Sequence, residues 1–464
     1  MSSLESPFRV IVVGAGVAGL TASHCLQKAG IEHVVLERRS EIAPPEGASI
    51  AIYPHGARIL HQIGCLEAAK NAHGQDILLL ERREFLQILY NRLLDKTRIR
   101  TGCTVKEVKQ LVSGVEVKLS DGTIETGDMV LGCDGVHSMV RNLMWDHADK
   151  TTTGLITVKE KTYIDEAIKT HWKCLIGMGP AAPGLGGRDM TVVHDKRYSF
   201  LALTQPDRVF FFVFFRLKKS FSWPKRERYT DEDAEALAAS IADHPVAPTM
   251  VFGELWNKRH RGALISLEEG VLEHWHHGRI ALAGDSAHKI TPNIALGGNS
   301  SMESVVVLCN HLRQMMVNQN GAKPSLATLN KTFAAYQTER LARVKHIMEY
   351  SSLITNVQAW RTPLYKFVAN WVLPLQPDRA IADQLGEIIR GAPKLDFVDV
   401  ADFASGRLPW KDENNKAEEQ KKSKIVGGGP SSSWLAQLAQ IMSAAMAIGM
   451  VVFAAQYFRP LITV

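Results

Sequence analysis

The first hydrophobic run of the chain predicts a buried strand followed by a sharp turn and a helix. Residues 8–13 (FRVIVV) are mostly apolar, and Gly14-Ala15-Gly16-Val17-Ala18-Gly19 follows at once. Residues 20–29 then have a helical pattern that ends at Gly30, and residues 33–36 form a second apolar run. Strand, glycine-rich turn, helix and strand in this order are typical of the start of a parallel α/β sheet.

Two later apolar runs also end in polar turns. Residues 129–133 lead into Asp134-Gly135-Val136-His137-Ser138, and residues 279–283 lead into Gly284-Asp285-Ser286-Ala287-His288. Ligands bind at the carboxyl ends of the strands in such sheets, so we expect both turns to meet the ligand of the first turn. Residues 47–52 form another small-residue strand that suits a long ligand passing over the sheet.

The middle of the chain has a different pattern. Residues 149–271 contain extended segments such as 190–193 and 209–217 (VFFFVFFRL) among turn residues, which predicts a second domain built on a β-sheet. After Ser301 the pattern becomes helical.

The C-terminal part predicts a linker and a membrane anchor. Residues 411–424 carry nine charges and residues 427–433 are rich in Gly, Pro and Ser, as in a flexible linker. Residues 434–457 have no charge and would make a helix of about 36 Å, enough to cross a bilayer. An amphipathic or core-docking helix is the alternative, because three glutamines interrupt this stretch.

Charges beside the apolar stretch suggest its orientation. Lys421, Lys422 and Lys424 precede it and only Arg459 follows it, so we expect a single-pass protein of the endoplasmic reticulum with a cytoplasmic catalytic body. The polar first nine residues, followed by a run that glycines interrupt, do not match a secretory signal.

Composition narrows the class of protein. A chain of 464 residues with 45% hydrophobic content can form two packed domains, and a net charge of +6 gives little reason to expect a nucleic-acid partner. The six cysteines occur singly without a C-x-x-C pair, which argues against a disulfide framework and a zinc site.

The glycine-rich turn has the chemistry of a dinucleotide site. Gly14 permits the tight turn, Gly16 lets the backbone approach a pyrophosphate, and Gly19 lets helix and strand pack closely. Glu37 lies 18 residues beyond Gly19, where its carboxylate can accept hydrogen bonds from an adenosine ribose without a 2′-phosphate. A glycine-rich turn alone can occur by chance, but its strand context and Glu37 favour a dinucleotide.

Together, these motifs resemble a known family. The chain is similar over residues 8–350 to the aromatic-hydroxylase-like flavoprotein monooxygenases, which have the same three signatures in the same order. Gly297-Gly298-Asn299, Glu303 and the C-terminal apolar stretch resemble the membrane-bound fungal epoxidases that act on prenylated substrates in meroterpenoid and indole-diterpene pathways.

The resemblance implies roles for individual residues around FAD. It assigns the pyrophosphate cradle to Gly14, Gly16 and Gly19 and the ribose contact to Glu37. Further FAD contacts are implied for Ala51, Arg83, Asp134, Asp285 and Gly298. Arg141 belongs to the same flavin and nicotinamide motif as Asp134. Three of these residues have simpler alternatives: Arg83 as a solvated charge, Asp285 as a helix cap, and Asp134 as part of a strand-terminal Asx turn.

The predicted fold follows from the resemblance and the patterns together. We expect a Rossmann-type FAD-binding α/β domain interleaved with a mainly β substrate domain, followed by a helical region, a linker and a transmembrane helix. The corresponding ranges are 7–148 and 271–355, 149–270, 356–410, 411–433 and 434–457.

The resemblance also implies the reaction. FAD would carry the oxygen chemistry with NADPH or NADH as a transient co-substrate, which agrees with the lack of a credible catalytic triad or metal cluster. The leading hypothesis is epoxidation of a prenyl double bond, with a downstream membrane-bound terpene cyclase as a potential partner. The alternatives are aromatic-ring hydroxylation, a flavin oxidase or dehydrogenase, and a prenyl-binding escort protein without activity.

Substrate contacts are expected from the middle domain. Arg188, Arg197 and Tyr198 flank its strands, with Arg197 and Tyr198 as catalytic candidates, and residues 210–215 could line an apolar pocket. Ordinary core and surface positions are the alternative for each of them.

The chain departs from the family pattern at two places. Only sixteen residues separate Leu66 from Arg83, where we expect a longer segment with a strand of the substrate domain. Leu296 stands where relatives often have glutamine, close to the expected flavin ring.

Overall fold

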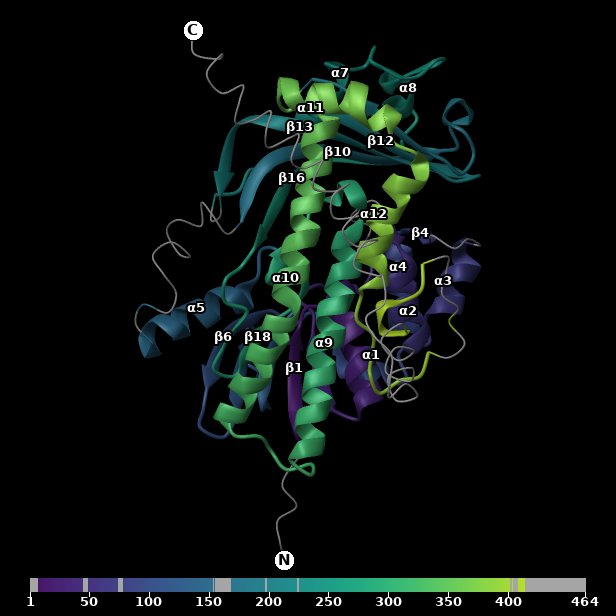
Figure 1. Cartoon of the computed structure of the whole chain (residues 1–464). Coiled ribbons are helices and arrows are strands. Elements are labelled where there is room, and N and C mark those ends of the chain that lie inside the picture. The colour runs from purple at the N-terminus through teal and green to yellow at the C-terminus, as the bar shows by residue number, and fades with distance from the viewer. Residues whose placement is uncertain are drawn as a thin grey trace, which may run out of the picture.

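The computed structural model describes residues 7–44, 49–73, 78–152, 154, 168–196, 198–222, 225–400, 403 and 408–413. Figure 1 shows two stacked parts, with a parallel sheet and long helices below and a broad second sheet above.

The lower sheet is the predicted α/β sheet. Its strands are β17 (His276–His277), β18 (Ile280–Leu282), β9 (Met129–Gly132), β1 (Arg9–Val13), β2 (Glu32–Leu36) and β5 (Ile99–Arg100), in this spatial order. β1 pairs in parallel with β2 and β9, and β18 pairs in parallel with β9. Residues far apart in sequence therefore end at the same edge of the sheet, as the sequence predicted.

Helices and a small sheet surround the lower sheet. α1 (Val17–Ala29) packs against α9 (Leu296–Asn318), and α9 packs against α10 (Leu326–Gln358), which confirms the helical pattern after Ser301. This part also contains α4 (Arg82–Asn91), α5 (Met139–Thr151) and the three-stranded sheet of β6 (Val105–Gln110), β7 (Val115–Leu119) and β8 (Ile124–Gly127).

The second sheet confirms that the middle of the chain is mainly β. Its strand order is β11 (Met190–His194), β12 (Tyr198–Thr204), β13 (Arg208–Ser222), β10 (Lys169–Pro180), β16 (Arg261–Val271) and β19 (His288–Lys289), and all of these pairs are antiparallel. β19 comes from the chain after the lower sheet, so the two parts are interleaved. The exact domain boundaries stay a prediction.

Side chains alternate between the two faces of the second sheet. On β13, Phe211 and Phe215 join a core that α7 (Asp231–Ala239) and α8 (Phe252–Asn257) cover, while Phe210, Phe212 and Phe214 belong to a separate apolar cluster on the other face. The phenylalanine run thus serves both faces of the sheet.

The short segment between Leu66 and Arg83 forms structure of its own. It contains α3 (Leu66–His73) and β4 (Leu78–Glu81). β4 pairs with β3 (Ser49–Ile52), which precedes α2 (Pro54–Gln62) in the chain. The side-chain amide of Gln205 donates to the carbonyl of Leu79 at 2.7 Å. This segment therefore reaches the second sheet through β4.

The helical region after α10 consists of α11 (Pro363–Phe367), a π-helical turn η5 (Val368–Val372), a 3-10 turn η6 (Leu373–Leu375) and α12 (Asp378–Arg390). Within the described ranges, no helix is both long and apolar enough to cross a bilayer. The predicted span at residues 434–457 lies outside those ranges.

A buried ion cluster joins the long helices. Glu303 of α9 is fully buried, and its carboxylate accepts hydrogen bonds from Arg340 at 2.6 Å and from Arg343 at 2.7 and 2.8 Å, both on α10. The two guanidinium groups outweigh the desolvation of the carboxylate and hold the pKa of Glu303 well below its usual range. Burial also lowers the pKa of neighbouring His55 to about 4, so this histidine is neutral at pH 7.

Removing one member of this cluster should destabilise the fold. Arg340→Met leaves Glu303 buried with less compensation, and we expect the free energy of unfolding to fall by about 3 kcal/mol. Exposed Arg313 on α9 provides the control, because Arg313→Met should change this free energy by less than about 0.5 kcal/mol. Chemical denaturation followed by circular dichroism measures both, and equal effects would contradict the role of the cluster.

Candidate functional site

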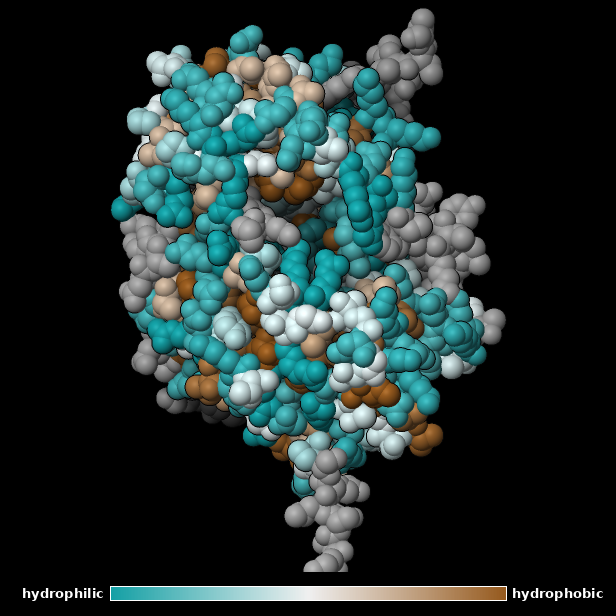
Figure 2. Space-filling view, turned by 180° about the vertical axis from the view of Figure 1, so that it is seen from behind, coloured by the Kyte–Doolittle hydropathy of each residue, from teal (hydrophilic) through white to brown (hydrophobic). Residues whose placement is uncertain are grey.

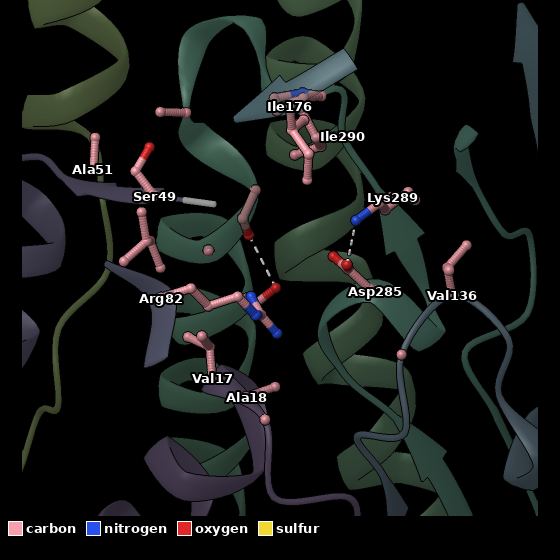
Figure 3. Close-up of a pocket in the computed structure, with 18 of the residues that line it drawn as sticks. Val17, Ala18, Ser49, Ala51, Arg82, Val136, Ile176, Asp285, Lys289 and Ile290 are labelled. Atoms are coloured by element: carbon pink, nitrogen blue, oxygen red, sulfur yellow. Dashed lines mark hydrogen bonds and ion pairs between the residues drawn. The ribbon is translucent and has the colours of Figure 1, made fainter. Parts of the chain in front are cut away.

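A large cavity lies between the lower sheet and the second sheet. Its volume is about 1490 Å³, and its walls come from the three predicted turns, from β3, from the start of α9 and from the apolar face of the second sheet. Figure 2 shows a hollow between the two parts of the molecule with apolar residues in its walls, and Figure 3 shows part of the lining.

The glycine-rich turn forms one wall of the cavity, and two of its three glycines leave no room for a side chain. Gly14 has φ +100°, and a Cβ at this position would lie 2.6 Å from the carbonyl oxygen of Cys133. A Cβ at Gly19 would lie 1.8 Å from the carbonyl oxygen of Gly14. At Gly16 the nearest atom to an added Cβ is Arg82 Nη2 at 3.9 Å, so this glycine faces open cavity.

Glu37 sits beside this turn. One carboxylate oxygen accepts a hydrogen bond from the Ala15 amide at 2.7 Å, and the other accepts from the Arg39 amide at 3.0 Å. Glu37 lines the cavity, and α1 begins at the same wall without a side-chain cap. An uncapped helix N-terminus next to a carboxylate fits a pyrophosphate followed by a ribose.

The Asp285 turn lies on another side of the cavity. Asp285 is in the 3-10 turn η3 (Gly284–Ser286), and its carboxylate pairs with Lys289 Nζ at 2.5 Å, as Figure 3 shows. It does not cap a helix. Lys289, which the sequence analysis did not single out, also lines the cavity, and its four-residue spacing from Asp285 was the available signal.

The Asp134 turn has a structural role in addition to its place in the lining. The Asp134 carboxylate accepts hydrogen bonds from Ser138 Oγ at 2.5 Å and from the Met139 and Val140 amides at 2.7 and 3.0 Å, which stabilises the start of α5. Burial raises the pKa of this carboxyl. The Asp134 side chain therefore stabilises the first turn of α5 through residues four to six positions on, not through the bond two residues on that defines an Asx turn, and a cofactor contact stays a prediction.

Arg141 connects the two aspartate turns. Its guanidinium donates to the carbonyls of Val136 at 2.9 Å and Ser286 at 3.2 Å, and burial lowers its pKa to about 10. Arg141 is fully buried and does not line the cavity, so it positions the turns.

The start of α9 forms the far end of the cavity. Ala295 adopts a left-handed conformation with φ +50°, and α9 begins after it without a side-chain cap, so Gly297 and Gly298 line the wall. Asn299 donates to the carbonyl of Ala51 at 2.9 Å, which fixes β3 against this helix end. Leu296 points into a separate apolar core with Ile290, Ile347 and Ile388, and the glutamine-to-leucine difference therefore changes packing behind the cavity.

Arg82 lines the cavity, whereas the sequence analysis chose its neighbour Arg83, and a contact of either arginine with the flavin diphosphate stays a prediction. Arg82 lines the cavity at the start of α4, where Figure 3 shows it beside Val17 and Ala18. Arg83 is exposed and does not line the cavity. Neighbouring residues on a helix point about 100° apart, so a shift of one position changes which arginine faces the cavity.

The second sheet provides an apolar wall. Its cavity-facing side chains come from four strands: Ile176, Leu201, Leu203, Phe212, Ile265 and Leu267. Tyr198 is on the opposite face, where it packs against Phe200 and His244, so the prediction that it contacts the reacting groups is not supported by its position. Arg197 lies outside the described residues.

Arg188 lines the cavity at the end of this wall. Its backbone has φ +144°, which is costly for a residue with a side chain, and the amides of Arg188 and Asp189 donate to Thr204 Oγ1 at 3.2 and 2.7 Å. In the described part of the chain its guanidinium makes no hydrogen bond or ion pair, whereas neighbouring Arg208 pairs with Asp207.

The arrangement suits a dinucleotide cofactor and a hydrophobic substrate in one space. Among the described residues, no group of three or more metal-ligating side chains could hold a metal ion. The uncapped ends of α1 and α9, the glycine wall and Glu37 would hold the cofactor, and the sheet would hold the substrate.

Comparisons with known proteins agree with this geometry. The family model described as "FAD binding domain" matches residues 8–77 and 69–351. The chain is 38% identical over 444 residues to "FAD-dependent monooxygenase DEP2" of Alternaria brassicicola, covering 89% of this chain and 83% of that protein. It is 33% identical to "FAD-dependent monooxygenase esdpE" of Penicillium shearii, covering 98% and 96%.

A solved structure shares the fold. Klebsiella pneumoniae HpxO complexed with FAD and uric acid has a TM-score of 0.64 to this chain at 18% identity, covering 83% of this chain and 97% of HpxO.

Gly16 offers a test of where the cofactor binds. A methyl group at Gly16 meets no protein atom closer than 3.9 Å, so Gly16→Ala should fold normally but project into the ligand space. We expect the Kd for FAD to rise at least about tenfold with little change in the melting temperature of the apoprotein. Gly187→Ala, which also meets nothing within 4 Å, is the control. An unchanged Kd, measured by flavin fluorescence, would exclude close approach of FAD to Gly16.

Proposed function

Because the chain belongs to the FAD-binding domain family and is an FAD-dependent monooxygenase, we propose that it epoxidises a carbon–carbon double bond in the prenyl part of a hydrophobic secondary-metabolite intermediate. The observation that carries this proposal is the cavity itself. One continuous space has dinucleotide-binding turns on one side and an apolar sheet face on the other. FAD would supply the oxygen chemistry when bound.

The chain's own residues prepare this space for an apolar substrate. Ile176, Leu201 and Phe212 offer no hydrogen bonds, so they favour a hydrocarbon chain and exclude water from the wall they form. A cyclase acting on the resulting epoxide, as proposed from the sequence, would be a separate partner.

NADPH or NADH is the proposed reductant. Arg38, Arg226 and Lys289 line the cavity around His137. Burial, and to a smaller extent these positive charges, lower the pKa of His137 to about 4. Arg38 and Arg226 would attract the phosphates of a dinucleotide that docks transiently, beside Glu268 at 3.6 Å from His137 and the Lys289–Asp285 pair. The sequence has a single glycine-rich dinucleotide fingerprint, which FAD would occupy. NADPH or NADH would therefore dock elsewhere, and the residues around His137 are the proposed place.

Two alternatives remain from the sequence analysis. An aromatic-ring hydroxylase of the same family would use the same FAD site with a flatter substrate. A prenyl-binding escort protein would keep the fold without FAD. Intact glycines at positions 14, 16 and 19 support the monooxygenase over the escort protein.

Product analysis tests the proposed reaction. Purified protein should show the absorption bands of oxidised FAD, and NADPH oxidation should accelerate when a farnesylated aromatic acceptor is added. Mass spectrometry and NMR should then find an oxygen atom from O₂ in a prenyl epoxide. A hydroxylated aromatic ring would reject the epoxidase assignment, and protein that never binds FAD would favour the escort protein.

Arg188 should recognise an oxygen-bearing head group. A charge-assisted hydrogen bond from its guanidinium would hold a phenolate, enolate or carboxylate while the chain lies on the apolar wall. Arg188→Met should raise KM about tenfold or more, with a smaller effect on kcat, and Arg188→Lys should recover part of the loss. Arg313→Met, outside the cavity, is the control in steady-state kinetics. An unchanged KM would remove Arg188 from the site.

A further inference from the structure

The segment after α10 exposes large apolar side chains on one surface. Phe367, Trp371 and Leu375 are 56%, 67% and 81% exposed, and they recur every four residues through α11, η5 and η6. A four-residue spacing keeps helical side chains near one side. Large exposed apolar groups gathered in this way mark an interaction surface, whereas single ones are ordinary. We call these residues, with Pro363 and the turns between them, the 363–375 surface.

The chain segment that carries this surface, residues 351–377, has only positively charged residues. Residues 351–377 contain no Asp or Glu, and their only charged residues are Arg361 and Lys366. Arg216 of β13 donates to the carbonyl of Arg361 at 3.5 Å, and exposed Lys218 and Lys219 continue along the same strand. Figure 1 shows α11 beside β13 at the end of the molecule farthest from the start of the chain. An apolar surface with a basic border is the result.

We propose that the 363–375 surface docks the folded body onto an anionic lipid bilayer. Phe367, Trp371 and Leu375 enter the boundary between headgroups and acyl chains, where aromatic side chains are favoured. Arg361 and Lys366 meet the negative headgroups. This contact is separate from the apolar stretch at residues 434–457: that stretch would tether the chain, whereas the 363–375 surface would orient the body.

A bilayer fits this surface better than a second copy of the chain. A symmetric dimer would bring identical patches together and place Arg361 and Lys366 close to their own copies, with no acidic residue in the segment to balance them. Lipid provides the opposite charge and an apolar layer together. The uncharged stretch at residues 434–457 favours the same partner.

The position of the surface also links the bilayer to the cavity. α12 follows the surface directly in the chain, and Leu385 on α12 lines the cavity. Docking through residues 363–375 would place this side of the cavity near the lipid. Delivery of a hydrophobic substrate from the bilayer rests on the proposed function, whereas the docking itself does not.

A fluorescent label at Trp371 tests the docking in the full chain. Trp371→Cys and, as a matched control, Leu94→Cys are made in a Cys103→Ser background, because the other five cysteines are buried. Leu94 is also an exposed apolar residue, at 84%, but lies outside the surface. Each protein is labelled with an environment-sensitive dye and added to vesicles of phosphatidylcholine and phosphatidylserine that contain nitroxide-labelled lipid.

The expected result is a blue shift and strong quenching at position 371, weaker in vesicles of phosphatidylcholine alone, with neither change at position 94. No quenching at position 371, or equal quenching at both positions, overturns the proposal. A blue shift without vesicles also overturns it: a dependence on protein concentration would indicate a second copy, and independence would indicate cover by another segment of the same chain.

A kinetic arm separates docking from function. The triple variant Phe367→Ser, Trp371→Ser and Leu375→Ser should raise KM several-fold for a substrate carried in vesicles and leave kcat unchanged in detergent. Equal KM values would overturn the delivery step. Quenching at position 371 in a protein that forms no product from any prenylated substrate would support docking and reject the proposed function.

Discussion

The carboxylate of Glu303 is fully buried, and the fold depends on the two arginines that neutralise it. Arg340 and Arg343 come from α10, so they fix the rotation of α9 about its axis relative to its neighbour. The N-terminus of α9 forms the far end of the cavity, and Asn299, one turn before Glu303, holds Ala51 of β3. The ion pairs between α9 and α10 thus fix the position of the α9 N-terminus, whose backbone would face the cofactor.

The sequence predicted best those parts of the site where the backbone geometry permits only one type of residue. Gly14 and Gly19 can be assigned from the sequence because any side chain would collide with the adjacent backbone, and Glu37 follows from the strand that carries it. The order of the strands at the sheet edge follows from the same α/β rules.

The residues that the sequence misplaced are those whose direction depends on tertiary packing. Arg82 and Arg83 are equally polar, and only the exact start of α4 decides which one faces the cavity. Tyr198 alternates with Leu201 and Leu203 across β12, and the face that receives the helices α7 and α8 cannot be read from an apolar strand. The sequence analysis did not single out Lys289, whose pairing with Asp285 appears only in the structure, and it named Asn299 only as part of a motif, without its contact to Ala51.

The pairing of β19 with β16 has a consequence for exchanging parts between relatives. Gly270 and Val271 form a ladder with Lys289 and His288, and Lys289 also pairs with Asp285. A graft that replaced only the middle of the chain would therefore separate a strand from its sheet and a lysine from its aspartate. A segment exchanged between relatives must therefore extend through Lys289. The apolar wall of the second sheet and the Asp285 turn then come from the same protein.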